Sequence, residues 1–208
     1  MRPLNSKIAW TVWGGLLLVI VGVVVTYLRS LDGTPSLPVL GYVSTFSLTN
    51  QLGRVVNSTA MQGQVWVADV IFTRCPLQCV RLTKQMAALQ ADLPPGKPIK
   101  LVSLSADPVF DTPEVLKKYG DRYNAVHGNW HFLTGPKSEI QRLSVEDLKF
   151  VVVDKAPDQR DSADDLFIHS TRFVLIDKQG RIRAYYDGEA PATRAQLLKA
   201  IDKLLRER

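Results

Sequence analysis

The stretch Phe72-Thr73-Arg74-Cys75-Pro76-Leu77-Gln78-Cys79 contains the only two cysteines of this 208-residue chain. A nearly continuous apolar run, 65–72, leads into it, as in a central strand that is buried on both faces. Apolar residues then recur at helical spacing up to Leu93, which predicts a helix over 77–93. Both sulfurs should therefore lie where a strand ends, beside a helix N-terminus. That position lowers the pKa of a thiol and favours the thiolate, which attacks disulfides and binds soft metals.

The rest of the pattern alternates between strands and helices and ends in a hairpin and a last helix. We predict a hairpin over 46–56, strands at 99–104, 130–133 and 150–153, helices from Thr112 and Pro136, a second hairpin over 173–186, and a final helix that Thr193 and Gln196 begin as a capping box. The alternation gives a parallel core, and the late hairpin adds antiparallel strands. The predicted fold class is α/β: a thioredoxin-like α/β/α sandwich with a mixed sheet and an extra N-terminal β-hairpin.

One transmembrane helix is predicted to precede this domain. Residues 8–28 are uncharged, and their length matches a hydrocarbon core of roughly 30 Å. Arg2 and Lys7 lie before this run, so residues 1–7 are expected in the cytoplasm and the rest of the chain outside. A cleaved signal peptide is the competing interpretation, but no small-residue cleavage site follows the run. We expect a bacterial inner-membrane anchor at 8–28, a linker at 29–44 and a periplasmic domain at 45–208.

Composition narrows the class of partner. The chain is 46% apolar and 22% charged with a net charge of +6, and its basic residues are scattered. Basic residues interleaved with aromatics would indicate a nucleic-acid surface, and no such block occurs. The charge fits a solvated surface near an anionic membrane.

Several motifs in order carry a resemblance to a known family. They are Val70–Cys79, Leu104-Ser105-Ala106-Asp107-Pro108 with Asp111-Thr112-Pro113, Trp130–Gly135, and His169-Ser170 before Phe173–Asp177. Together they resemble the Sco/SenC family, membrane-tethered thioredoxin-like copper proteins of cytochrome c oxidase assembly. The resemblance covers about residues 40–205. It implies that Cys75, Cys79 and His169 bind copper.

Two thiolates and an imidazole suit copper chemically, as Cu(I) with two or three ligands or as Cu(II) with water added. The loop before His169 is acidic, and a mobile loop that delivers the third ligand would suit a protein that releases its metal. The sequence departs from the usual family pattern at Val80 and Ile168. The resemblance implies as partners the copper ion, the copper-binding subunit of cytochrome c oxidase, and other copper chaperones or thiol reductants.

Asp69 is the least expected residue, because it lies within the apolar run six positions before Cys75. Its offset resembles that of the buried aspartate of thioredoxin, which makes it a candidate proton acceptor for a thiol. It could instead face a polar pocket or bond to a neighbouring strand. His127 and His131 have no spacing that links them to the thiols, and we expect a packing role for His131, which lies beside Trp130 in a short predicted strand.

Three functions stay open at this point. The first is a metallochaperone that delivers copper to the binuclear copper site of the oxidase. The second is an enzyme, a thiol–disulfide oxidoreductase that reduces the copper-ligating cysteines of the oxidase subunit through a redox disulfide between Cys75 and Cys79. The third is a redox or copper sensor. A purely structural disulfide would close a very short loop and restrain the unfolded chain little.

Overall fold

A computed structural model describes residues 6–31, 36–75, 77–156, 158 and 167–207 of the chain. Side chains are described for these residues except 6–9, 11, 28–31, 154 and 167–169. The chain divides after Ser36 into two compact units, and each is described by itself.

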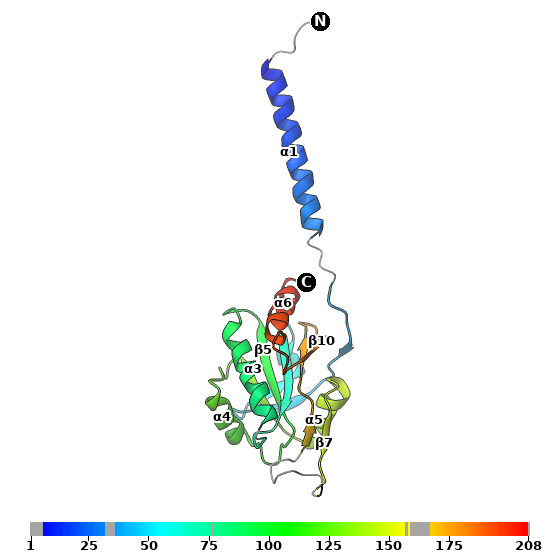
Figure 1. Cartoon of the computed structure of the whole chain (residues 1–208). Coiled ribbons are helices and arrows are strands. Elements are labelled where there is room, and N and C mark those ends of the chain that lie inside the picture. The colour runs from blue at the N-terminus through cyan, green and yellow to red at the C-terminus, as the bar shows by residue number, and fades with distance from the viewer. Residues whose placement is uncertain (1–5, 32–35, 76, 157, 159–166, 208) are drawn as a thin grey trace. The chain divides into compact units, whose positions relative to one another are not determined.

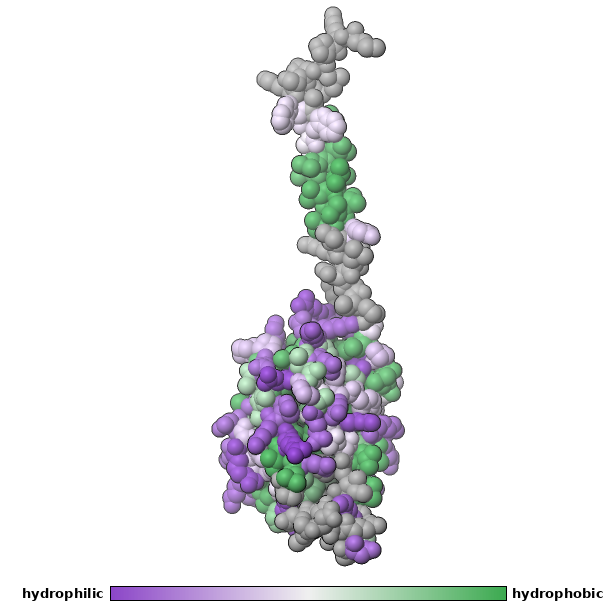
Figure 2. Space-filling model, in the orientation of Figure 1, coloured by the Kyte–Doolittle hydropathy of each residue, from purple (hydrophilic) through white to green (hydrophobic). Residues whose placement is uncertain are grey.

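The first unit contains one helix, α1 (Ser6–Leu31). Its middle is a continuous apolar surface in Figure 2, and Trp10, Leu18 and Tyr27 are all exposed. The prediction of a membrane-spanning helix over 8–28 is not supported, since no helix among the described residues combines the length and apolar character needed to cross a bilayer.

The second unit is built on a sheet with the strand order β1-β10-β9-β4-β5-β6-β2-β3 (Figure 1). Its strands are β1 (Gly41–Tyr42), β2 (Ser47–Asn50), β3 (Val55–Asn57), β4 (Val65–Ile71), β5 (Ile99–Ser105), β6 (Trp130–Thr134), β9 (Arg172–Ile176) and β10 (Arg181–Asp187). Strands β4, β5 and β6 are parallel, and the flanking strands add to them antiparallel. The predicted mixed sheet and the N-terminal hairpin β2–β3 are confirmed.

Helices cover both faces of this sheet. They are α2 (Ser58–Met61), α3 (Gln78–Asp92), α4 (Pro113–Arg122), α5 (Lys137–Gln141) continued by the π-helix η1 (Arg142–Asp147), and α6 (Thr193–Arg206). In Figure 1, α3 and α4 lie on one side of the sheet and α5 on the other. Every residue of β4 is buried, as expected for a strand covered on both faces. The predicted α/β/α sandwich is therefore confirmed.

The folded unit begins earlier than the expected boundary at residue 45. Leu37 starts the compact unit, and β1 pairs with β10 within the stretch that we expected to be linker. The buried Arg183 guanidinium donates hydrogen bonds to the carbonyls of Leu37 and Pro38, and at 2.7 Å to Asp177 Oδ2 and Glu207 Oε2. This buried ion pair network holds the entering chain, so the linker is shorter than 29–44.

Two local predictions differ from the structure. The capping box at Thr193 is wrong: Ala192 is the N-cap residue of α6, and the Thr193 hydroxyl donates instead to the carbonyl of Asp187. The segment that contains His169 also forms a strand, β8 (Phe167–His169), which pairs antiparallel with β7 (Val152–Asp154) in a separate two-stranded sheet. Both differences come from tertiary contacts, which local sequence patterns do not encode.

Candidate functional site

The thiol loop, defined here as residues 72–79 with Pro76 outside the described residues, leaves the sheet at the end of β4. Ile71 pairs with Ser105 at the carboxyl ends of the parallel strands β4 and β5. The Ala106 N–H then donates to the Ile71 carbonyl at 2.7 Å, so the two strands end together. Ligand sites form at such ends because the chain turns into a helix there and exposes N–H groups.

Cys75 lies just before the first turn of α3. Its sulfur accepts a hydrogen bond from the Cys79 N–H at 3.4 Å. The N-cap residue Leu77 makes no side-chain capping bond, so Cys75 Sγ supplies the acceptor that Ser or Asp usually provides. The N–H donor and the helix dipole both favour negative charge on this sulfur. Cys75 is 9% exposed.

Cys79 is fully buried within the first turn of α3. Its sulfur accepts from the Phe72 N–H at 3.4 Å, which brings the second thiol back under the start of the loop. Burial raises the pKa of the Cys79 thiol well above its ordinary value, and the neighbouring Cys75 and the charge of Asp69 raise it further. Both cysteines are buried, but Cys79 is the more enclosed of the two, and its burial favours the protonated form of its thiol.

Asp69 lies close enough to Cys79 for its charge to act on that thiol, as we expected from its position in β4. The residue is fully buried in the middle layer of the sandwich, and its backbone pairs with Ser103 of β5. A buried carboxylate beside a buried thiol is a common arrangement for proton transfer. Its role as proton acceptor remains a prediction.

His169 is the third predicted ligand, and its side chain lies outside what the structure describes. Its backbone ends β8 opposite Val152, and the following Ser170 N–H donates to the Val151 carbonyl at 2.9 Å. Among the described side chains, no group of three His, Cys, Asp or Glu could hold a metal ion. The structure thus brings together Cys75 and Cys79 and leaves ligation by His169 a prediction.

The segment after His169 nevertheless packs against α3, the helix that contains Cys79. Gly188 donates its N–H to the Thr171 carbonyl at 2.7 Å. A Cβ added at Gly188 would meet that carbonyl oxygen and the Cδ2 atom of Leu82 on α3. Only a glycine lets these three elements approach so closely. This packing brings the chain after His169 beside α3, whose first turn contains Cys79.

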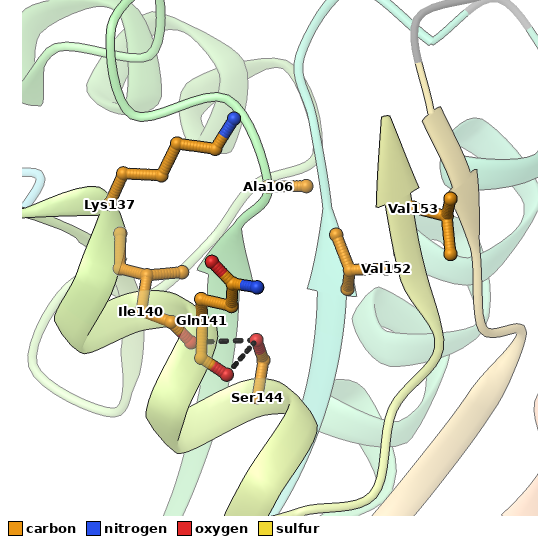
Figure 3. Close-up of a pocket in the computed structure, with 7 residues that line it drawn as sticks. All are labelled: Ala106, Lys137, Ile140, Gln141, Ser144, Val152 and Val153. Atoms are coloured by element: carbon orange, nitrogen blue, oxygen red, sulfur yellow. Dashed lines mark hydrogen bonds between the residues drawn. The ribbon is translucent and has the colours of Figure 1, made fainter. Parts of the chain in front are cut away.

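A pocket of about 240 Å³ lies beside Ala106, the residue whose N–H donates to Ile71 at the end of β4. Its lining comes from Ala106 after β5, from α5 and η1, and from Val152 and Val153 of β7 (Figure 3). The side chains of Lys137 and Gln141 extend toward this space, whereas the Ser144 hydroxyl is bonded to the Ile140 carbonyl at 2.6 Å. The lining residues that the structure describes carry no thiol, imidazole or carboxylate.

The other two histidines bond to neighbouring elements of the fold, and His131 is partly buried on β6, as expected for a packing role. His127 accepts from Gln51 Nε2 at 2.9 Å and donates to Asp121 Oδ1 at 2.7 Å, which ties α4 to the β2–β3 turn. His131 lies on β6 with Asn50 Nδ2 at 3.4 Å, and burial lowers its pKa.

Sequence reasoning missed how the loop after β5 holds the thiol loop. Arg74 Nη2 donates to Asp107 Oδ2 at 2.5 Å, and its guanidinium carbon lies 4.3 Å from the centre of the Phe110 ring. Asp107 and Asp111, two acidic residues after a predicted buried strand, could have indicated these contacts. We used them only as part of the motif that carries the family resemblance.

Comparisons with known proteins agree with this architecture. The SCO1/SenC family profile matches residues 38–206. A SCO1 protein homolog from Bacillus subtilis is 34% identical over 170 residues, which are 80% of this chain and 85% of that protein.

Two solved structures extend the likeness. BsSco, described as a member of the Sco family of cytochrome c oxidase assembly proteins with a disulfide switch, is 28% identical with a TM-score of 0.67 over 84% of this chain and 100% of its own. ScoI from Bradyrhizobium japonicum, solved with copper bound, shares the fold at 19% identity with a TM-score of 0.62 over 78% of this chain and 99% of its own. On the profile match and the identity to the Bacillus subtilis homolog, the chain belongs to the SCO1/SenC family.

Proposed function

We propose that this protein binds copper through Cys75 and Cys79, with His169 as the third ligand, and delivers it to the binuclear copper site of cytochrome c oxidase. The observation that carries the proposal is the convergence of both thiols on the first turn of α3, where Cys75 Sγ accepts the Cys79 N–H at 3.4 Å. Family membership supports it, because BsSco is described among oxidase assembly proteins and ScoI was solved with copper bound.

The donor set fits copper as cargo. Thiolates select Cu(I), and an imidazole added to them accommodates either Cu(I) or Cu(II). Both thiols must lose their protons on binding, and the raised pKa of Cys79 makes its proton the harder one to remove. The buried Asp69 is the proposed acceptor for that proton. A site that holds its ion by few ligands at the end of a sheet leaves open coordination positions for a receiving protein.

Thiol–disulfide exchange is the second candidate, and the asymmetry of the thiols favours it. In this reaction the Cys75 thiolate attacks a disulfide of the oxidase subunit. A mixed disulfide forms between Cys75 and one cysteine of the subunit, and the other cysteine of the subunit leaves as a thiolate. Cys79, with its proton passed to Asp69, then attacks Cys75 Sγ and releases the second cysteine. The partner is reduced by two electrons, the protein ends with a Cys75–Cys79 disulfide, and a thiol reductant must restore it.

Complementation of a strain that lacks this gene separates the two functions. Substitution of either cysteine by serine should abolish oxidase assembly under both. His169→Ala should abolish assembly under copper delivery and leave it largely intact under thiol reduction, since exchange needs no imidazole. Assembly with both cysteines replaced would contradict both candidates.

We also propose a cellular location for the protein. The exposed apolar side chains of α1 favour attachment of the N-terminal helix to the bacterial inner membrane. Arg2 and Lys7, which precede the apolar run 8–28, favour a folded unit on the periplasmic side. Protease added to spheroplasts should digest the folded unit, and protection equal to that of a cytoplasmic marker would contradict this orientation.

A further inference from the structure

Asp111, in the loop between β5 and α4, is a fully buried carboxylate that binds the thiol loop. Its Oδ1 accepts the Thr73 hydroxyl at 2.5 Å, and its Oδ2 accepts the Thr73 N–H at 3.2 Å. Oδ2 also accepts the Ser105 hydroxyl at 2.6 Å. A carboxylate that uses both oxygens in this way fixes its donors in one geometry.

The donors that Asp111 holds come from the two segments that form the site. Thr73 lies two residues before Cys75 in the thiol loop, and Ser105 is the last residue of β5. Ser105 Oγ in turn accepts the Asp107 N–H at 3.0 Å, and Asp107 binds Arg74. Thr73 and Arg74 are therefore both tied to the end of β5, Thr73 through Asp111 and Arg74 through Asp107.

A buried carboxylate is costly in free energy unless its hydrogen bonds are satisfied. Burial raises the pKa of Asp111, and the bonds from Ser105 and Thr73 oppose that rise. Core packing alone would be served by an apolar residue at this position. The retained carboxylate is best accounted for by what it orients, which is the backbone that leads to Cys75.

We infer that Asp111 is a positioning residue that presets the thiol loop, so that Cys75 and Cys79 face one ion before the ion arrives. The expected effect of Asp111 on copper affinity rests on the proposed copper-binding function. Partners outside the ligand shell that orient ligands typically change metal affinity by about 10- to 100-fold. Asp111 touches neither sulfur and acts through Thr73.

The test compares three variants of the full-length chain. Asp111→Asn keeps the volume but replaces one acceptor oxygen with an N–H₂ donor that faces the Thr73 and Ser105 donors. Thr73→Val removes the hydroxyl, and Thr73→Ser restores it. Asp177→Asn is the matched control, because Asp177 is also a buried, multiply bonded carboxylate. It follows Ile176, which pairs with Trp66 near the start of β4, so it lies at the end of the sheet opposite the thiols.

Two readouts are measured: Cu(I) affinity by competition with a chromophoric chelator, and amide hydrogen exchange of residues 72–75 without metal. We expect Asp111→Asn to weaken Cu(I) binding by about 10- to 100-fold and to speed exchange in the loop. Thr73→Val should act in the same direction, Thr73→Ser should resemble wild type, and Asp177→Asn should change neither readout.

Wild-type affinity and loop exchange in Asp111→Asn would overturn the inference, as would an equal loss of copper affinity in Asp177→Asn. A wild-type chain that fails to bind Cu(I) would contradict the proposed function instead. In that case the exchange rates of the loop still decide whether Asp111 positions it.

Discussion

The substitution Gly188→Ala perturbs the contact between α3, which contains Cys79, and the chain that follows His169. The ideal Cβ at this position would lie 2.6 Å from the Thr171 carbonyl oxygen and 3.3 Å from Phe173 Cε2, and it would also meet Leu82 Cδ2. Leu82 and Phe173 are buried, so neither side chain can swing into solvent. The backbone at Gly188 must therefore move apart from Thr171 and from α3.

The expected loss has two parts. Overpacking of a filled core costs about 1–3 kcal/mol. Displacing Thr171 also weakens the hydrogen bond that its carbonyl accepts from Gly188 at 2.7 Å, which costs about 0.5–1.5 kcal/mol more. We expect the free energy of unfolding to fall by about 1.5–4.5 kcal/mol. Because Thr171 lies two residues after His169, Cu(I) affinity should fall as well.

Urea unfolding of the metal-free, reduced protein measures the first effect. Gly128→Ala is the control, since an added Cβ there has no atom within 4 Å, and we expect a change within about 0.5 kcal/mol. A double-mutant cycle with His169→Ala measures the second effect, because Gly188→Ala should not weaken copper binding further once the imidazole is gone.

Two results would refute this reasoning. A Gly188→Ala protein as stable as Gly128→Ala would mean that β9, β10 and α3 are not packed as described. A loss of copper affinity that persists undiminished in the His169→Ala background would mean that the segment after His169 does not carry the effect to the metal.

Further predictions concern the buried charges. The free energy of unfolding of the reduced, metal-free protein should fall as the pH rises through the ordinary thiol pKa of about 8.5, by up to about 1.4 kcal/mol per pH unit, because unfolded Cys79 releases its proton there while folded Cys79 keeps it. Cys79→Ala should lack this slope. Asp69→Asn should lower the pKa of Cys79, since the charge that raises it is removed, and thiolate absorbance in a Cys75→Ser background measures the shift; an unchanged titration would remove Asp69 from the site. Arg183→Met should cost about 3 kcal/mol in urea unfolding, because Asp177 stays buried without its guanidinium partner, and a cost below 1 kcal/mol would contradict that assignment.

Local patterns in the sequence were sufficient for the centre of the fold. The apolar run 65–72 and the helical spacing after it predicted β4 and α3, and the thiols lie where the chain passes from this strand into this helix, as expected. The hairpin β2–β3 followed from its alternation and glycine turn. These elements are specified by periodicity and turn residues, which act over a few positions.

Contacts between distant segments could not be predicted in this way. The pairing of β1 with β10 depends on Arg183, which reaches back to Leu37 and Pro38. The hydrogen bonds that Asp111 accepts from Thr73 join residues 38 apart in the sequence. Thr193 reads as an N-cap, but its hydroxyl bonds to the carbonyl of Asp187. The motif that contains Asp107 and Asp111 identified the loop after β5 as part of the family pattern. It did not predict that this loop binds Thr73 and Arg74.

X-ray absorption of the Cu(I)-loaded chain tests copper ligation by this site most directly. The wild type should retain copper after desalting, with two sulfur ligands and one imidazole nitrogen. Cys79→Ser should lose a sulfur, and His169→Ala should lose the imidazole. A wild type that releases its copper on desalting, or that holds it through nitrogen and oxygen alone, would contradict a copper site at Cys75, Cys79 and His169.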